Sequence, residues 1–139
     1  MIVIDTNVVS ELMRSTPAPQ VMDWWNQQRI AELFLTALTE AEILFGLETL
    51  PRGRRRTALA AAAKETFDQD FDGRILPFDR EAAREFALIA AARRGRGLPI
   101  SQVDAQIAAI ARSRGAAVAT RNTKDFDHCG VTVIDPWSA

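Results

Sequence analysis

Short apolar runs alternate with longer amphipathic segments along the whole chain. The apolar runs predict buried strands at residues 1–4, 33–37, 74–78, 116–120 and 131–134. Apolar positions spaced by three and four residues predict helices at 8–13, 18–28, 39–50, 55–71, 80–94 and 101–114. Strands that alternate with helices are typical of a three-layer α/β domain with a mostly parallel sheet. No repeat or long linker interrupts the pattern, so we expect one domain over residues 1–139.

Residues at the predicted element ends support these boundaries. Asp79 and Ser101 can cap the helices that follow them, because their side chains accept hydrogen bonds from free N–H groups. Pro51 ends the helix before it, since proline cannot continue the backbone hydrogen bonding. Gly115 can adopt the left-handed conformation at which many helices end.

Composition narrows the chemistry that this chain can perform. It is 47% hydrophobic and 25% charged, which is ordinary for a globular protein. Its apolar runs are too short to span a membrane, and its first residues lack the basic start of a signal peptide, so we expect a cytoplasmic protein. One cysteine and one histidine exclude a disulfide framework, a cysteine-rich zinc site and paired-histidine metal motifs. An enzyme of this composition would depend on carboxylates.

The net charge of −1 hides an uneven distribution. Residues 1–51 carry 2 basic and 7 acidic side chains, whereas residues 52–100 carry 11 basic and 7 acidic ones. The basic residues form two arginine clusters, which are Arg52, Arg54, Arg55 and Arg56, and Arg93, Arg94 and Arg96. Arginine suits bidentate binding of phosphate. The clusters therefore predict either contacts with a nucleic acid or solvated helix ends.

An acidic residue follows the first predicted strand, and a polar loop follows the fourth. Asp5 closes the run I-V-I, and residues 120–127 read T-R-N-T-K-D-F-D. In open parallel sheets the functional crevice lies beyond the carboxyl ends of the strands, where the strand order reverses. The first strand commonly flanks this point, so we expect the two loops to face each other. Asp5 could instead only cap the next helix, and Asn122 and Asp125 could be ordinary loop residues.

Asp104 lies on a predicted helix face that is otherwise apolar. It shares this face with Ala108 and Ala111, where an unpaired charge is costly unless it binds a metal or a partner. Alternatively, Asp104 is a first-turn carboxylate that completes the helix cap at Ser101.

Glu42 lies on another predicted helix, in a stripe with Phe45 and Gly46. A glycine inside a helix costs about 1 kcal/mol relative to alanine, which suggests that another group packs closely against this stripe. Glu40 and Glu48 are competing acidic candidates on the same helix, and any of the three could be a solvated surface charge.

A pocket that gathered Asp5, Glu42 and Asp104 would place like charges together. A pair of them 4 Å apart repels by about 4 kcal/mol at an effective dielectric of 20. A hard cation keeps such a cluster ionised, and all-oxygen donors favour Mg²⁺ or Mn²⁺ over Zn²⁺. Such an ion can activate water and offset charge on a phosphoryl group. The set therefore predicts a metal-dependent phosphodiester hydrolase, with the arginine clusters holding the polyanion.

Four strings in the chain resemble one protein family. They are I-V-I-D-T-N-V at 2–8, L-T-E-A-E-I-L-F-G at 38–46, V-D-A-Q-I-A-A-I-A at 103–111 and A-T-R-N-T-K-D-F at 119–126. In this order they resemble the PIN-domain family, specifically the VapC-type toxin ribonucleases of bacterial toxin–antitoxin pairs. R-I-L-P-F-D at 74–79 and D-P-W at 135–137 are similar to its FitB-like branch.

The resemblance implies a PIN-like α/β fold and a Mg²⁺- or Mn²⁺-dependent endoribonuclease that cleaves single-stranded RNA. It also implies a homodimer and a small VapB-like antitoxin, which inhibits the toxin and alone connects the complex to operator DNA. The carboxylates that match the family's metal site are Asp5, Glu42 and Asp104. Its fourth position corresponds to Asn122 or Asp125. The polar positions that orient the carboxylates correspond to Thr6, Asn7 and Thr120.

Two alternatives from other functional classes stay open at this point. The chain could be a binding module that holds an antitoxin and tunes its grip on operator DNA, with little nuclease activity. It could also be a small-molecule phosphohydrolase that uses the same metal site, although the arginine clusters and the lack of a D-x-D pair after the first strand weigh against this.

Overall fold

Five short strands form one sheet in the order β3-β2-β1-β4-β5, and every neighbouring pair is parallel. The computed structural model describes residues 1–139. The strands are β1 (Ile2–Ile4), β2 (Leu33–Thr36), β3 (Ile75–Leu76), β4 (Ala117–Ala119) and β5 (Val133–Ile134). Strand β1 is central, and its Val3 pairs with Phe34 of β2 on one side and Val118 of β4 on the other. The prediction of a five-stranded parallel sheet is confirmed.

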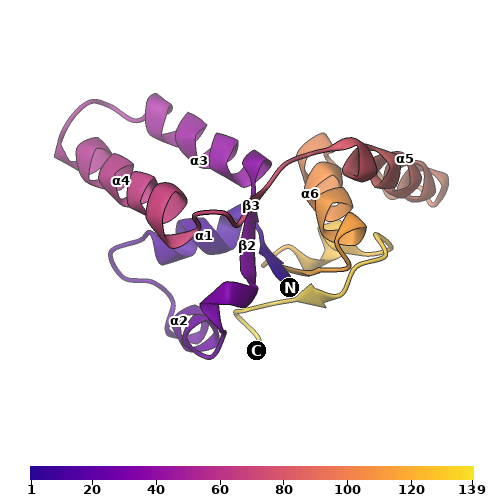
Figure 1. The fold of residues 1–139 in the computed structure, drawn as a ribbon, viewed down its shortest axis with the longest axis horizontal. Helices are drawn as coiled ribbons and strands as arrows, with labels where there is room; N and C mark the ends of the chain where they lie inside the picture. Colours follow the sequence, from indigo (N-terminus) through magenta and orange to yellow (C-terminus); the bar gives the residue numbers. More distant parts are fainter.

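Helices cover both faces of this sheet, as Figure 1 shows. The helices are α1 (Thr6–Leu12), α2 (Pro19–Asn26), α3 (Ala37–Thr49), α4 (Arg54–Glu65), α5 (Arg80–Gly95) and α6 (Gln102–Ser113). Helices α1 to α4 lie on one side of the sheet, and α5 and α6 pack together on the other side (Figure 1). This is the predicted three-layer arrangement. None of the helices combines the length and the apolar character that a bilayer crossing requires.

The apolar side chains of the strands alternate between two cores. Val3 and Val118 point into the core beneath α5 and α6, whereas Ile4 and Ala119 point into the core beneath α1 to α4. Successive strand residues face opposite sides of a sheet, so two adjacent apolar residues fill both cores at once. Strands that are buried on both faces therefore appear in the sequence as short continuous apolar runs.

The predicted caps are present at three helix ends. The Asp79 carboxylate accepts a hydrogen bond from the Ala82 N–H, and the Ser101 hydroxyl accepts one from the Asp104 N–H. Gly115 has a φ of +65°, in the left-handed region that glycine adopts without strain. These residues fix where α5 and α6 begin and where α6 ends.

The α-helix predicted over residues 55–71 is wrong in its last six residues. Helix α4 ends at Glu65, and a π-helical turn, η2 (Thr66–Asp70), follows it. Phe67 and Phe71, at and just after this turn, are both buried in the core beneath α1 to α4. Apolar spacing alone does not separate a π turn from the α-helix before it, because both bury residues four or five apart. Two short 3-10 turns, η1 (Ile30–Glu32) and η3 (Thr123–Phe126), were not predicted either.

Candidate functional site

The carboxyl ends of β1 and β4 lie side by side, and the candidate site is built on them. Asp5 follows β1 directly, and Thr120 follows β4 directly. The Asp5 N–H donates to the Ala119 carbonyl, and the Thr120 hydroxyl donates to Asp5 Oδ2 at 2.8 Å. Strand β1 stands between β2 and β4, so the chain order reverses beside it. The two loops that the sequence predicts to face each other do so.

The Asp5 carboxylate is held in place by three polar neighbours. Asp5 is 4% exposed, and its Oδ1 accepts a hydrogen bond from the Thr6 N–H at 2.8 Å. Its Oδ2 accepts from the Asn7 amide at 3.3 Å as well as from Thr120. Asn7 also donates to Thr120 Oγ1 at 3.2 Å, which closes a ring of hydrogen bonds. Thr6, Asn7 and Thr120 therefore make the orienting contacts that the resemblance implied, and Asp5 is also the N-cap residue of α1.

Glu42 joins this network through the Thr6 side chain. The Thr6 hydroxyl donates to Glu42 Oε1 at 2.6 Å, so Thr6 contacts Asp5 with its backbone and Glu42 with its side chain. The Thr6 hydroxyl has one proton, so the Thr39 hydroxyl, 3.0 Å away, must donate to it. Thr39 is fully buried and was missed from the sequence, although it is a polar residue on the buried face of α3.

The structure separates Glu42 from its two competitors. Glu48 forms an ion pair with Arg56 at 3.0 Å, and Glu40 lines a hollow with Arg56 and Lys64 on the other flank of α3. Glu42 is the acidic residue of α3 that contacts the Asp5 network, and its carboxylate is exposed.

The expectation that a group packs against Gly46 is wrong. Nothing lies within 4 Å of the position of a Cβ on Gly46, and Phe45 is 72% exposed. The buried face of α3 is instead the stripe of Thr39, Ile43 and Leu47, spaced four residues apart. Phe45 and Gly46 therefore lie on the outer part of the helix.

Asp104 lies in the first turn of α6, close enough to the site for its charge to raise the pKa of Asp5. Its backbone N–H donates to the Ser101 hydroxyl at 3.2 Å, so Ser101 caps the helix. Ala108 and Ala111 are fully buried, as the apolar face predicts. The pKa of the half-buried Asp104 carboxyl is raised, first by desolvation and then by the negative charges of Asp125 and Glu42.

The electrostatics show that the three carboxylates act on one another. Burial raises the pKa of Asp5 from 3.8 to about 6, hydrogen bonds from Thr120 and Thr6 oppose this rise, and the charges of Asp104 and Glu42 add to it. A cation between these groups would offset the repulsion, and their oxygen donors are those that Mg²⁺ prefers. No three Asp, Glu, His or Cys side chains lie close enough to hold an ion among themselves. The donor set therefore fits an ion that is bound by one or two carboxylates and keeps several water ligands. This is the usual coordination of Mg²⁺ in proteins.

This raised pKa predicts how the metal-free protein responds to pH. Between about pH 4 and pH 6 the folded state keeps the Asp5 proton that the unfolded state releases, so stability falls as pH rises through this window. A shift from 3.8 to about 6 corresponds to about 3 kcal/mol. Asp5→Asn removes this pH-dependent cost, so with chelator the stability of the variant relative to the native chain should be greater at pH 7 than at pH 4. Urea unfolding at pH 4 and pH 7 measures the difference in the free energy of unfolding between the variant and the native chain. The same difference at both pH values would contradict this prediction.

The two candidates for the fourth position lie on different sides of the site. The Asn122 N–H donates to Thr120 Oγ1 at 3.1 Å, which places Asn122 beside the Asp5 network. Asp125 lies on η3 and raises the pKa of Asp104, which places its charge on the Asp104 side. Both residues are exposed, and which of them serves the site stays open.

The predicted role of Arg93 as an RNA contact is wrong. Arg93 is 4% exposed, and its guanidinium donates to four backbone carbonyls instead of facing solvent. Arg56 is also engaged, through Glu48 and the Leu50 carbonyl. The cluster members that remain exposed and form no ion pair are Arg52, Arg54, Arg55, Arg94 and Arg96.

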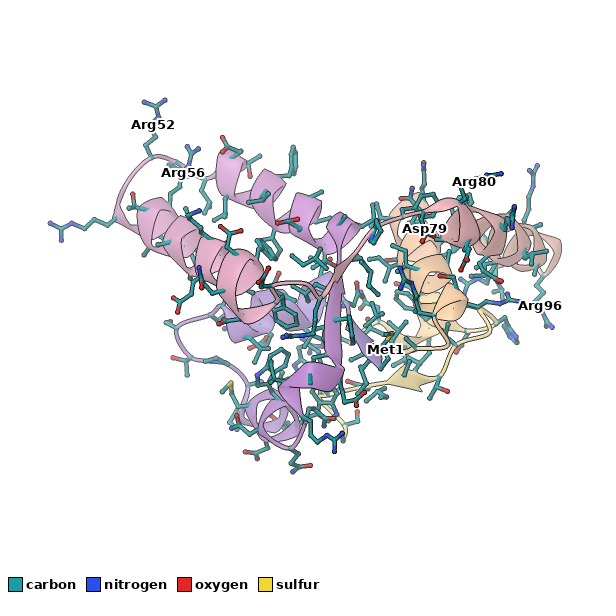
Figure 2. All side chains as sticks on the ribbon, in the orientation of Figure 1. Met1, Arg52, Arg56, Asp79, Arg80 and Arg96 are labelled. Atoms are coloured by element: carbon teal, nitrogen blue, oxygen red, sulfur yellow. The ribbon has the colours of Figure 1, made fainter.

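The two arginine clusters lie at opposite ends of the molecule. Figure 2 shows Arg52 in the connection before α4 and Arg96 directly after α5, with the sheet between them. A single bound phosphate cannot touch both clusters. A longer polyanion that crossed the carboxyl end of the sheet could approach each of them.

Arg121 is a further cation next to the site that sequence reasoning missed. Its backbone N–H donates to Asn7 Oδ1 at 3.2 Å, and its guanidinium lies 5.0 Å from the centre of the Trp137 ring. The pKa of Glu11, a buried carboxylate, is lowered mainly by a hydrogen bond from the Ala18 N–H, and the charge of Arg121 adds a small further lowering. The only sequence signal was its place inside the string T-R-N, directly after Thr120.

A groove leads away from the site between α1, α3 and α4. It has a volume of about 760 Å³ and is lined at one end by Thr6 and Glu42. Arg14 and Arg55 also line it, together with apolar residues such as Leu59. Arg14 is paired with Glu11, whereas Arg55 forms no ion pair. The groove thus connects the acidic site with the arginine cluster at the start of α4.

Comparison with known proteins agrees with this architecture. The model of the PIN domain family matches residues 2–131. The chain is 42% identical over 137 residues to VapC ribonuclease Y4jK of Sinorhizobium fredii, covering 99% of this chain and 98% of that protein. It is 36% identical to toxin FitB of Neisseria gonorrhoeae, covering 99% of each chain. The solved structure of FitAB bound to the IR36 DNA fragment is similar with a TM-score of 0.93 and 36% identity, covering 99% of this chain and 96% of that one.

Proposed function

This chain belongs to the VapC-type branch of the PIN-domain family, and from this premise we propose that it is a metal-dependent endoribonuclease toxin of a type II toxin–antitoxin system. One observation carries the proposal. The Asp5 carboxylate is buried and held by three polar neighbours, and the negative charges of Glu42 and Asp104 are close enough to raise its pKa. Carboxylates that repel each other at the carboxyl end of a parallel sheet are suited to a divalent cation and a phosphodiester. The name of the relative Y4jK, a ribonuclease, supports RNA as the substrate.

The contacts of the site residues suggest two roles, which are binding of the cation and orientation of its ligands. Asp5, Glu42 and Asp104 would hold Mg²⁺ or Mn²⁺, directly or through waters. The bound ion would lower the pKa of a water molecule and offset the charge of the scissile phosphodiester. Thr120 and Asn7 fix the Asp5 carboxylate by hydrogen bonds at 2.8 and 3.3 Å.

The exposed polar residues around this centre have a second role in the proposal. Thr6 turns the Glu42 carboxylate toward the site with its 2.6 Å hydrogen bond. The Asn122 amide is free to hold a water molecule or a phosphate oxygen, and Asp125 adds negative charge beside Asp104. These side chains need no rearrangement of the fold to reach a substrate at the end of the sheet.

We expect the groove between α1, α3 and α4 to hold one arm of the RNA strand. It begins at Glu42 and passes Arg55, which has no acidic partner and can bind a phosphate. A variant in which serine replaces Arg52, Arg54 and Arg55 should have a KM for RNA about tenfold higher and a kcat within about twofold of the native value. Phosphate contacts that are equally strong in the ground state and the transition state affect substrate binding alone. Steady-state cleavage of a fluorescent RNA at two salt concentrations measures this, and the variant should show a weaker dependence on salt. A fall in kcat with an unchanged KM would exclude this path.

The partners follow from the same family membership. FitAB, the toxin–antitoxin pair of a relative, has been solved bound to a DNA fragment. We therefore propose that a VapB-like antitoxin inhibits this chain in the cytoplasm, that the chain forms a homodimer, and that operator DNA contacts only the antitoxin. Antitoxin binding alone would also be expected of a binding module without nuclease activity, which is the alternative function.

One assay separates the proposed function from its alternatives. The purified chain, free of antitoxin, is incubated with Mg²⁺ and three substrates: single-stranded RNA, DNA of the same sequence, and a generic phosphate ester. We expect internal cleavage of RNA only. Cleavage of the ester alone would indicate a small-molecule phosphohydrolase. No turnover, together with tight antitoxin binding, would indicate a binding module.

A further inference from the structure

Arg93 is a buried cation without an acidic partner. It lies in the last turns of α5, is 4% exposed and forms none of the ion pairs in the structure. Burying a charge is costly unless hydrogen bonds replace the water that it loses. The Arg93 guanidinium donates hydrogen bonds to four backbone carbonyls, so it holds main chain in place.

These carbonyls belong to two segments that carry site residues. Nε donates to the Leu98 carbonyl at 2.7 Å, in the connection between α5 and α6 that leads to Asp104. Nη1 donates to the carbonyls of Lys124, Asp125 and Asp127, at 3.3, 3.1 and 2.7 Å. This second group spans η3, which carries Asp125. One side chain thus joins the connection before α6 to the turn after β4.

Arg93 also acts on the site through its charge. It opposes the rise in the pKa of Asp104 that burial and the charges of Asp125 and Glu42 cause. It is therefore a positive group within electrostatic range of Asp104. No solvent-exposed phosphate contact could be made from this position.

We propose that Arg93 is a positioning residue of the nuclease site, which fixes the spacing between Asp104 and Asp125 by tying η3 to the connection before α6. This inference rests on the proposed function. A guanidinium donates from several nitrogens in a fixed plane, whereas a lysine ammonium is a point donor on a flexible stem. Lysine at this position therefore keeps the positive charge but loses the hydrogen bonds that connect the two segments.

The test compares Arg93→Lys and Arg93→Gln with the native chain. We expect kcat for RNA cleavage to fall 10- to 100-fold in both variants, since misplacing groups around a metal typically costs that much. KM for RNA should stay within about threefold. A rise in KM with an unchanged kcat would show a phosphate contact and overturn the proposal, as would native kcat in both variants.

Binding of Mn²⁺ to the purified chain, measured by calorimetry, gives a readout that does not need catalysis. Removing a positive charge near the site would by itself tighten cation binding. Positioning predicts the reverse, with the Kd for Mn²⁺ rising about tenfold or more in Arg93→Gln. Tighter or unchanged binding in this variant would overturn the proposal. If the native chain binds Mn²⁺ and does not cleave RNA, the proposed function fails and this measurement still decides the role of Arg93.

Arg84→Gln is the matched control, because Arg84 lies on the same helix, is exposed and forms no ion pair. It should match the native chain in kcat, KM and Mn²⁺ affinity. Hydrogen exchange should quicken at residues 122–127 in the Arg93 variants and stay native in β1 and β2. If neither Arg93 variant folds, the residue serves the fold as a whole and the positioning role is wrong.

Discussion

The Asp5→Asn variant should fold and lose RNA cleavage by about 10³-fold, which is the largest effect that we expect from one substitution. Asparagine has the shape of aspartate, keeps an oxygen for the Thr6 N–H and removes the charge that a cation needs. Removing a preorganised electrostatic group from an active site typically costs about 10²–10³-fold in kcat. The Asp5 carboxylate accepts hydrogen bonds from three donors, whereas the Glu42 carboxylate accepts one, so Asp5 is the more firmly held of the two.

The measurement is kcat for cleavage of a short RNA, with circular dichroism to confirm the fold. Asp23→Asn is the matched control, since Asp23 is exposed, lies on α2 and takes part in no ion pair. This control should cleave RNA at the native rate. Native activity in a folded Asp5→Asn protein would remove Asp5 from the mechanism and would contradict the proposed function.

Asp5 could be predicted from the sequence because local rules and topology agree there. A buried strand next to the point where strand order reverses must end at the functional edge of the sheet, and Asp5 is the next residue. Its partner Thr120 is 115 residues away, so no spacing rule connects the two. Only the adjacency of β1 and β4 does, and that depends on the packing of both cores.

Arg93 shows why residue type alone misleads. Its residue type predicts a surface position with Arg94 and Arg96, because three arginines in a short stretch are typical of a solvated or phosphate-binding helix end. The buried face of α5 runs through Ala82, Ile89 and then Arg93, at helical spacings of seven and four residues. This periodicity was present in the sequence and pointed inward. What the sequence could not show were the carbonyls of η3, a turn without any apolar pattern of its own.

The stripe of Glu42 illustrates the opposite error. In the sequence, Gly46 suggests close packing against the stripe that contains Glu42, and no such packing exists within the chain. Glu42 nevertheless contacts the Asp5 network, through a threonine on another helix. The resemblance to the family motif predicts Glu42 correctly as a neighbour of Asp5, whereas the packing expected from Gly46 is wrong.

The second large effect is expected when divalent cations are removed. With EDTA in excess the native chain should lose RNA cleavage by about 10³-fold, and Mg²⁺ or Mn²⁺ should restore it, because three mutually repelling carboxylates need a hard cation to bind a polyanion. Zn²⁺ should restore less activity, since His128 is exposed and Cys129 is buried, and neither belongs to the site.

The same ion should stabilise the folded chain. An ion present at 100 times its Kd adds about 2.7 kcal/mol to the stability of a protein that binds it only when folded. Mn²⁺ should therefore raise the Tm of the native chain and of Asp23→Asn, and raise that of Asp5→Asn much less. The shift in Tm is independent of RNA, so it tests the metal site apart from the reaction. Cleavage that persisted in EDTA after dialysis, with equal Tm values at all Mn²⁺ concentrations, would contradict the metal site that we propose.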